Sequence, residues 1–329
     1  TWLDRTNYFE TVPANQLELA LWLESDRMGF LLPAMTLDKL NNQRDVVKNE
    51  RRWRVDNQPY GDWDERIQMM VYPPDHPYHH SVIGSMEDLD AATIEDVQEF
   101  FRTYYAPNNA VLTICGDFDR STIEDQVNRY FGDIPSAPAA PPLPASALRL
   151  EKMKEPVRVE VEAEVALPRV YAAFRIPAYG DHRFYTADVL AHLLSGGKSS
   201  RLYKSLVREQ RLAQSVVGFA FPIVTGYAML VLWATAAAGK DLDTVEEALW
   251  KEVERFHSER AEAEEIERVL TGIESRHIIS MQKVGERADQ ISMFTTLFDD
   301  PDGLNDELDR YREVSADEVL TFATEFLTR

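Results

Sequence analysis

The spacing of apolar residues predicts a helical front part of the chain. Apolar positions recur at helical intervals over Leu17–Met28, Leu37–Asn57 and about Trp63–Tyr72, and Pro59-Tyr60-Gly61 separates the last two. Thr93 precedes a further amphipathic segment with Asp96 three residues on, which is the pattern of a capped helix start. The short apolar run 110–116 then predicts a buried strand.

The pattern changes to alternation in the second half. Val157–Val165 alternates Val with Glu, which predicts a half-buried strand, and we expect Tyr171–Ile176 to pair with it. Leu242–Thr328 is predicted to be helical almost throughout. Between them the pattern predicts helices over 184–194 and 200–210 and strands over 215–221 and 228–236.

A Pro-rich stretch separates the two halves. The residues from Ser136 to Ala145 contain too much Pro for a helix or a central strand, and they predict an extended, semi-rigid linker. We therefore expect three parts: residues 1–135 as the end of a first module, 136–156 as the linker and 157–329 as a second module.

An internal repeat connects the two modules. Thr93–Phe100 and Ser315–Phe322 share a capping residue, two acids, Val and Phe in the same register, 222 residues apart. Capped amphipathic helices also recur by chance, but each copy lies late in a block of strands followed by helices. The repeat favours an α+β fold of two homologous modules, each a mainly antiparallel sheet packed against helices.

The same offset leads to an expectation about the start of the first module and the end of the second. About 65 residues of the first module are expected before Thr1, and the last strand of the second module is expected after Arg329.

Composition excludes several classes of protein. The 329 residues include 56 Asp and Glu but only 35 Lys and Arg, and this net charge of −21 argues against a nucleic-acid binder. No apolar run is long enough for a membrane span, the first residues do not resemble a signal peptide, and the single Cys115 cannot form an internal disulfide. Nine Lys against 26 Arg leaves two explanations open: a halophilic surface, or codon bias with an ordinary acidic surface.

Few residues are candidates for chemistry. His76, His79 and His80 lie in a Pro-broken loop without the helical spacing of metal ligands, so we interpret them as structural. Glu50 shares a predicted buried helix face with Val46, Val47 and Trp53, and a buried carboxylate needs a cation, a metal or several hydrogen-bond donors. The neighbouring Arg residues 51, 52 and 54 are the ordinary alternative partners.

Several segments in fixed order resemble the insulinase and pitrilysin zinc metallopeptidases, in the bacterial group close to the mitochondrial processing peptidases. The resemblance extends over essentially the whole chain, and it rests on the segments 46–52, 57–61, 76–78, 84–85, 105–109, 116–117, 199–203 and 212–215.

The resemblance implies a zinc site to which this chain contributes Glu50. In that family two His of a His-x-x-Glu-His motif and a later Glu hold Zn²⁺, a bound water attacks the peptide, and the Glu of the motif is the general base. Glu50 matches the later Glu, and both the family spacing and the repeat place the His motif before Thr1. This chain by itself is therefore expected neither to bind catalytic zinc nor to cleave peptides.

The resemblance also implies sites for the peptide substrate. Thr1, Trp2 and Leu3 begin a segment expected to continue the edge strand on which peptides add as an extra strand, although a plain sheet strand fits equally well. Arg208 is a candidate for binding substrate carbonyl groups, with a solvated helix-face charge as the alternative. Two positions depart from the family pattern: Gln43 replaces a second acid, and Gln214 replaces a Tyr.

The function implied is that of a zinc-dependent metalloendopeptidase that cleaves unfolded peptides in a cleft between two modules. The alternative is a zinc-free, non-catalytic partner subunit of a heteromeric peptidase of the same family. Peptides are the expected partners, together with a second related chain in a homodimer or heterodimer. The residues leave open the substrate, the oligomeric state and whether the compartment is the bacterial periplasm or the cytoplasm.

Overall fold

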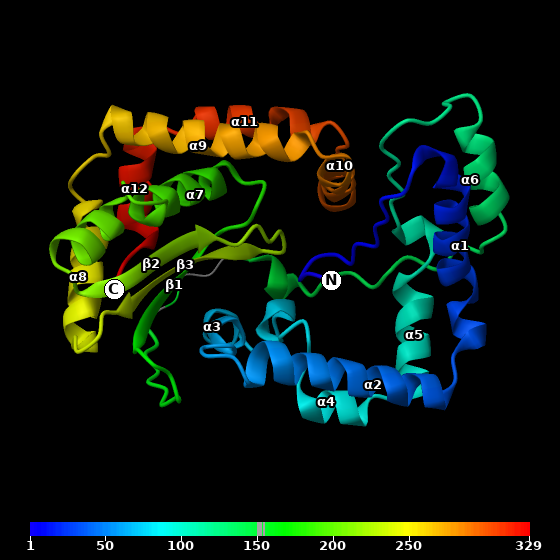
Figure 1. Cartoon of the computed structure of the whole chain (residues 1–329), viewed down its shortest axis with the longest axis horizontal. Coiled ribbons are helices and arrows are strands. Elements are labelled where there is room, and N and C mark those ends of the chain that lie inside the picture. Colours follow the sequence, from blue (N-terminus) through cyan, green and yellow to red (C-terminus); the bar gives the residue numbers. More distant parts are fainter. Residues whose placement is uncertain (150–152, 154) are drawn as a thin grey trace. The chain divides into compact units, whose positions relative to one another are not determined.

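Helices dominate the computed structural model, which describes residues 1–149, 153 and 155–329 (Figure 1). The chain packs into two units, and each is built from segments that are distant in sequence. Unit 1 comprises residues 1–58, 81–142 and 278–304, and unit 2 comprises 59–80, 143–277 and 305–329. The predicted boundaries at 135 and 157 follow the Pro-rich linker, whereas the packing places 59–80 in unit 2 and 278–304 in unit 1.

Unit 1 is helical in all its regular elements among the described residues. Its elements are α1 (Leu17–Ala34), α2 (Leu37–Arg51), the π-helix η2 (Arg52–Asp56), α4 (Met86–Ala91), α5 (Ile94–Tyr104), α6 (Ile123–Phe131) and α10 (Val284–Phe298). These bounds confirm the helices predicted over 17–28 and 37–57.

Unit 2 contains a three-stranded antiparallel sheet and helices, which confirms the α+β class. Its elements are α3 (Trp63–Val71), β1 (Arg169–Pro177), α7 (His182–Ser195), the π-helix η6 (Tyr203–Glu209), β2 (Ala213–Ala220), β3 (Tyr227–Ala236), α8 (Leu242–Arg255), most of α9 (Ala263–Met281), α11 (Gly303–Arg312) and α12 (Ala316–Phe326).

The strand order is β1-β3-β2, so β3 is central, and it is also the most deeply buried strand. Side chains alternate between the two faces of the sheet. Phe174 of β1 points to one face, where its ring lies 5.8 Å from that of Trp250 in α8 and where α7 also packs (Figure 1). Tyr171 points to the other face, where Trp63 of α3 stacks on it. Helices therefore cover the sheet on both sides.

The repeat is confirmed at the level of elements. Both α5 and α12 have 11 residues, begin 222 residues apart, and start with a complete capping box. Their surroundings differ, because Phe322 and Phe326 of α12 are buried in unit 2 whereas Phe100 of α5 is 52% exposed and Tyr104 39% exposed.

Three predicted strands are wrong. Residues 1–9, 110–116 and 157–165 are not in strands, and no neighbouring strand pairs with them among the described residues. A strand needs hydrogen bonds from a second strand, and apolar periodicity alone does not supply one. Val157, Val159 and Leu112 are accordingly about half exposed. The sheet expected in the first module is likewise not formed by the described residues, and β1 pairs with β3, not with 157–165.

The middle of the predicted linker, residues 145–148, is anchored on unit 2. Residues 145–148 form a short 3-10 turn in which Ala147 is fully buried. The Ala147 carbonyl lies 3.3 Å from Nε2 of the buried His76. It also faces Gly226, where a Cβ atom would approach it to 1.9 Å. The linker is therefore fixed at this point, and residues 150–152 and 154 lie outside the described part.

No helix in the described part of the chain is both long and apolar enough to cross a membrane.

Candidate functional site

Glu50 lies in the last turn of α2. The helix begins at Thr36, whose hydroxyl accepts a hydrogen bond from the Lys39 amide at 3.3 Å, and it continues into η2. One side of α2 is held to α4: Arg44 donates to the carbonyls of Leu89 and Ala92, and an ion pair joins Lys48 to Asp90. The backbone that carries Glu50 is therefore fixed.

The carboxylate of Glu50 is not buried, so this part of the prediction is wrong. Its side chain is 39% exposed, and Oε1 lies 2.9 Å from Nη1 of Arg54, one of the alternative Arg partners. Val46 and Trp53 are 50% and 67% exposed, respectively. Val47 is half-buried, so the predicted face is covered only in part. The ion pair with Arg54 is an exposed i,i+4 pair, which contributes only about 0.3–0.5 kcal/mol, so the carboxylate is available to other ligands.

Glu50 by itself does not fit a zinc ion. A catalytic zinc needs three protein ligands and one open position. The described residues contain no group of three or more His, Cys, Asp or Glu side chains placed to hold a metal. Zinc bound at Glu50 would therefore need further ligands.

The segment that begins with Thr1, Trp2 and Leu3 starts with a bend at residues 3–4. The Trp2 amide donates to the carbonyl of Arg5 at 2.9 Å. Arg5 and Asn7 both bond to Asp289 of α10, each at 2.6 Å. This segment is therefore held by side-chain contacts within unit 1, and not by the strand pairing that we expected.

Arg208 lies in η6, in the other unit from Glu50. Its side chain is 60% exposed and pairs with Glu209 at 3.3 Å, an arrangement that fits the alternative of a solvated charge. Gln214 is the extra residue of a β-bulge, because Ala213 and Ser215 pair with the consecutive residues Ala236 and Thr235. Bulges turn a side chain out of the ladder, and Gln214 is indeed exposed.

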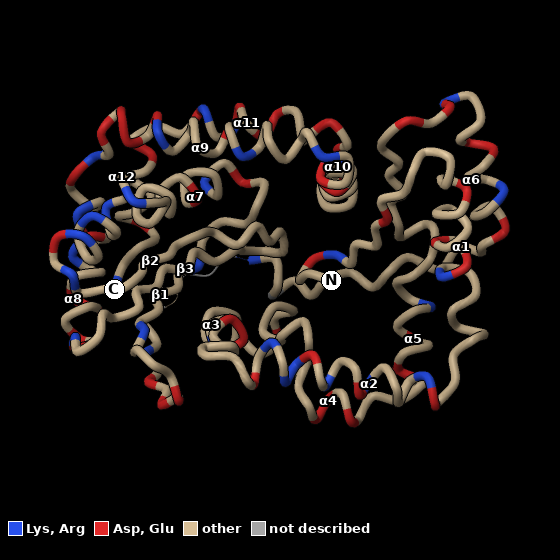
Figure 2. Tube along the Cα trace, viewed as in Figure 1, with Lys and Arg blue, Asp and Glu red and all other residues tan. Residues whose placement is uncertain are grey.

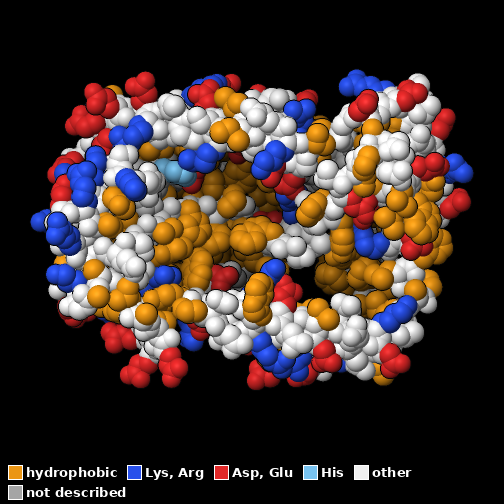
Figure 3. Space-filling model, viewed as in Figure 1, with side chains coloured by type: hydrophobic (Ala, Val, Ile, Leu, Met, Phe, Trp, Pro, Cys, Tyr) orange, Lys and Arg blue, Asp and Glu red, His pale blue; other side chains and the backbone are white. Residues whose placement is uncertain are grey.

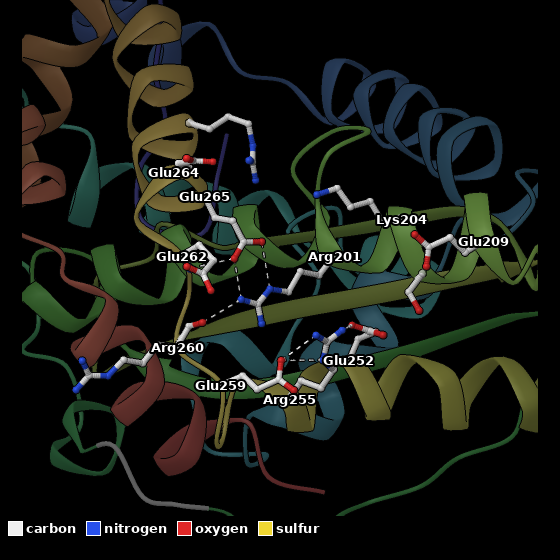
Figure 4. A pocket seen from close by; sticks show the side chains of 12 residues that line it. Arg201, Lys204, Glu209, Glu252, Arg255, Glu259, Arg260, Glu262, Glu264 and Glu265 are labelled. Carbon is white, nitrogen blue, oxygen red and sulfur yellow. Dashed lines mark hydrogen bonds and ion pairs between the residues drawn. The ribbon is translucent and has the colours of Figure 1, made fainter.

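Unit 2 also contains a charged cleft, of about 670 Å³, between η6, α8 and α9 (Figure 4). Arg201 lies in its middle and makes a two-pronged ion pair with Glu265, at 3.2 and 2.7 Å. The Arg201 guanidinium also lies 4.0 Å from the Phe256 ring centroid. Arg255 forms a second set of ion pairs, with Glu252 and Glu259.

Mutual pairing explains the electrostatics of this cleft. Burial disfavours the charge on Glu265, but hydrogen bonds from the Arg201 guanidinium and the Glu262 amide outweigh burial and lower the pKa of Glu265. Arg201 Nη1 is buried without a hydrogen-bond partner in the described structure. We interpret the Arg201–Glu265 ion pair as a contact that joins the helical turn before η6 to the start of α9, whereas the pairs of Arg255 stay within the end of α8 and the residues after it.

Sequence reasoning missed the Arg201–Glu265 ion pair. Arg201 belongs to the segment 199–203, which carries part of the family resemblance, but its partner Glu265 lies 64 residues further along the chain. Each of the two residues begins a separate helical segment, so no short sequence spacing indicates that they form a pair.

Comparison with known proteins identifies the family. The model described as the peptidase M16 inactive domain matches residues 91–273, more than half of the chain. The zinc protease PqqE of Helicobacter pylori is 27% identical over 99% of this chain and 72% of its own length. An uncharacterized zinc protease of Mycobacterium leprae is 27% identical over 74% of this chain and 53% of its own length.

Solved structures show the same fold. A protease from Helicobacter pylori superposes with a TM-score of 0.86 at 23% identity, covering 95% of this chain and 75% of the other. A peptidase M16 inactive domain from Pseudomonas fluorescens superposes with a TM-score of 0.73 at 18% identity, covering 95% and 73%. Because the family model matches more than half of the chain and the relatives bear the name of zinc protease, this chain belongs to the peptidase M16 family.

Proposed function

We propose that this chain is part of a zinc-dependent metalloendopeptidase that cleaves unfolded peptides, and that Glu50 is one of its zinc ligands. The observation that carries the proposal is the alignment of nearly the whole chain with a zinc protease, together with the family-like segment 46–52 around Glu50. Bound zinc would supply a polarising Lewis acid for peptide hydrolysis.

The residues of this chain have two roles in the proposal. Glu50 offers a carboxylate oxygen from a helix that Arg44 and Lys48 hold in place. Binding of a metal there requires the exposed pair with Arg54 to open, which costs little. Arg208 presents an exposed guanidinium that can donate to a peptide carbonyl.

The test is Glu50→Gln in the complete natural product of the gene. We expect zinc content to fall from one equivalent to a small fraction, and cleavage of an unfolded peptide to be lost, because the amide is a neutral and poor zinc ligand. Glu99→Gln is the matched control, since Glu99 is an exposed helical acid of the same unit. A Glu50→Gln protein that keeps both zinc and activity would contradict the proposal.

A second candidate is a zinc-free partner subunit that keeps the fold and pairs with a catalytic chain. The match to a family model described as an inactive domain favours it. The two candidates differ in the complete gene product: a catalytic chain contains His-x-x-Glu-His and binds zinc, whereas a zinc-free subunit lacks both.

A further inference from the structure

We propose that an aromatic and arginine cluster on the sheet of unit 2 binds the free C-terminus of a peptide that ends in an aromatic residue. The cluster consists of Tyr60, Trp63, Arg169, Tyr171, Phe219 and Trp233, and we call it the Arg169 site. The proposal deepens the proposed function, because hydrolysis of a peptide bond by water creates such a carboxylate terminus.

The aromatic side chains come from separate elements and remain partly open. Trp63 of α3 stacks on Tyr171 of β1 with a centroid distance of 5.8 Å and ring planes 5° apart. Trp233 of β3 lies 5.2 Å from Trp63, and Phe219 of β2 meets Trp233 edge-on at 5.7 Å. All four side chains are half-buried, and hydrophobic side chains gather over these strands in the space-filling view (Figure 3). A further aromatic ring would extend this arrangement favourably.

Arg169 stands among these rings without an acidic partner. Its guanidinium carbon lies 3.7 Å from the Tyr60 ring centroid and 5.5 Å from that of Trp233. Nε donates to the Thr235 hydroxyl at 2.9 Å, and Nη1 donates to the Tyr171 hydroxyl at 3.0 Å. None of the ion pairs of the described residues includes Arg169, which leaves a half-buried cation in a protein of charge −21.

The position of Arg169 is fixed before any ligand arrives. Tyr60 has a left-handed backbone with a φ of 59°, and its hydroxyl donates to the Leu167 carbonyl at 2.5 Å, which places the ring under the guanidinium. Asp62 lies near enough for its charge to influence Tyr171, but it is already paired with Arg66. A carboxylate that approaches Arg169 therefore competes with no neighbouring acid for this cation.

The compactness of the site favours a single residue that bears both groups. The guanidinium carbon and the Trp233 ring are 5.5 Å apart, a span that one C-terminal aromatic residue bridges from its carboxylate to its ring. The carboxylate would accept charge-assisted hydrogen bonds from Arg169, and the ring would pack on Trp63 and Trp233. An internal Asp or Glu side chain supplies the anion but not the ring.

The experiment titrates this chain in EDTA-containing buffer with three probes: N-acetylphenylalanine, its amide and N-acetylalanine. Calorimetry or ligand-observed NMR should detect binding of N-acetylphenylalanine, with the amide and the alanine derivative each weaker by about tenfold or more, since a charged hydrogen bond and a stacked ring are both needed. Equal binding of the acid and its amide would overturn the proposal.

Variants locate the binding in the protein. Arg169→Gln should abolish the preference for the acid over the amide, and Trp63→Leu should abolish the preference for phenylalanine over alanine. Arg312→Gln removes an exposed charge elsewhere in unit 2 and should change neither. If Arg169→Gln does not fold, Trp63→Leu still decides, and unchanged ring preference in a folded Trp63→Leu chain would overturn the site. Because no zinc or cleavage enters the assay, its failure differs from failure of the zinc proposal.

Discussion

Among single residues, Arg201 and Glu265 show how much a partly buried ion pair contributes. Their side chains are only 10% and 15% exposed. We expect Arg201→Gln to lower the free energy of unfolding by about 2–3 kcal/mol, because it leaves the Glu265 carboxylate poorly paired in a desolvated site.

Urea denaturation of the variant and the wild type measures this loss. Arg312→Gln is the control, since that side chain is 53% exposed and water screens its ion pairs, so a much smaller loss is expected. Equal effects of the two substitutions would show that the cleft around Arg201 is no more protected from water than the surface.

The lowered pKa of Glu265 makes the same pair sensitive to acid. A carboxyl group whose pKa is lower in the folded state stabilises the protein above its unfolded value of 4.5, and it loses this contribution as pH falls through the lower folded value. We therefore expect the difference in melting temperature between wild type and Glu265→Gln to be constant above about pH 5.5 and to shrink below pH 4.5. A difference that grows on acidification would contradict this assignment.

Local sequence predicted some properties of single residues and not others. The caps at Thr93 and Ser315 were readable, because the residues that form them lie three positions apart. The accessibility of Glu50 was not, since a helical face is buried only if another element covers it. The Arg169 site was also invisible, because Trp63 is separated from Tyr171 by more than a hundred residues.

At the scale of elements, the repeated helices α5 and α12 allow a matched comparison. Phe100 and Phe322 hold the same register in two helices of equal length and identical capping. Phe322 is 3% exposed and Phe100 is 52% exposed. We expect Phe322→Ala to cost about 3–4 kcal/mol of stability and Phe100→Ala less than about 1 kcal/mol.

Chemical denaturation of the two variants and the wild type measures both losses of stability, Phe322→Ala in unit 2 and Phe100→Ala in unit 1. Comparable losses would mean that the apolar face of α5 is covered in solution as thoroughly as that of α12.

Helices were predicted better than strands, for a physical reason. A helix satisfies its backbone hydrogen bonds internally, so the residues of α1, α2 or α8 suffice to indicate it. A strand depends on a partner elsewhere in the chain. The runs 215–221 and 228–236 pair with each other as β2 and β3. The runs 110–116 and 157–165 have equally suitable residues, but no strand lies beside them in the described structure.

At the scale of the whole molecule, charge is the dominant feature. Asp and Glu occur along the helices of both units, with Lys and Arg interspersed (Figure 2). The net charge of −21 means that repulsion opposes the folded state, and salt screens that repulsion.

We expect the melting temperature of the chain to rise as NaCl increases from about 0.05 M to 1 M, over which range the screening length falls from roughly 14 Å to 3 Å. A steep rise that continues into molar salt would favour the halophilic interpretation of the excess of Arg over Lys. A flat profile would contradict it and leave codon bias as the explanation.

The division into units has a consequence for a chain that is cut. Residues 59–80 pack in unit 2 although they precede the linker, and 278–304 pack in unit 1 although they follow it. Hydrolysis of one peptide bond between 136 and 142 would therefore yield two pieces, each holding part of both units. The nicked molecule should elute from a sizing column as one species and separate only in denaturant, as split proteins do. The Pro-rich linker joins the two halves of the sequence, but cutting it does not separate the folded protein into two independent domains.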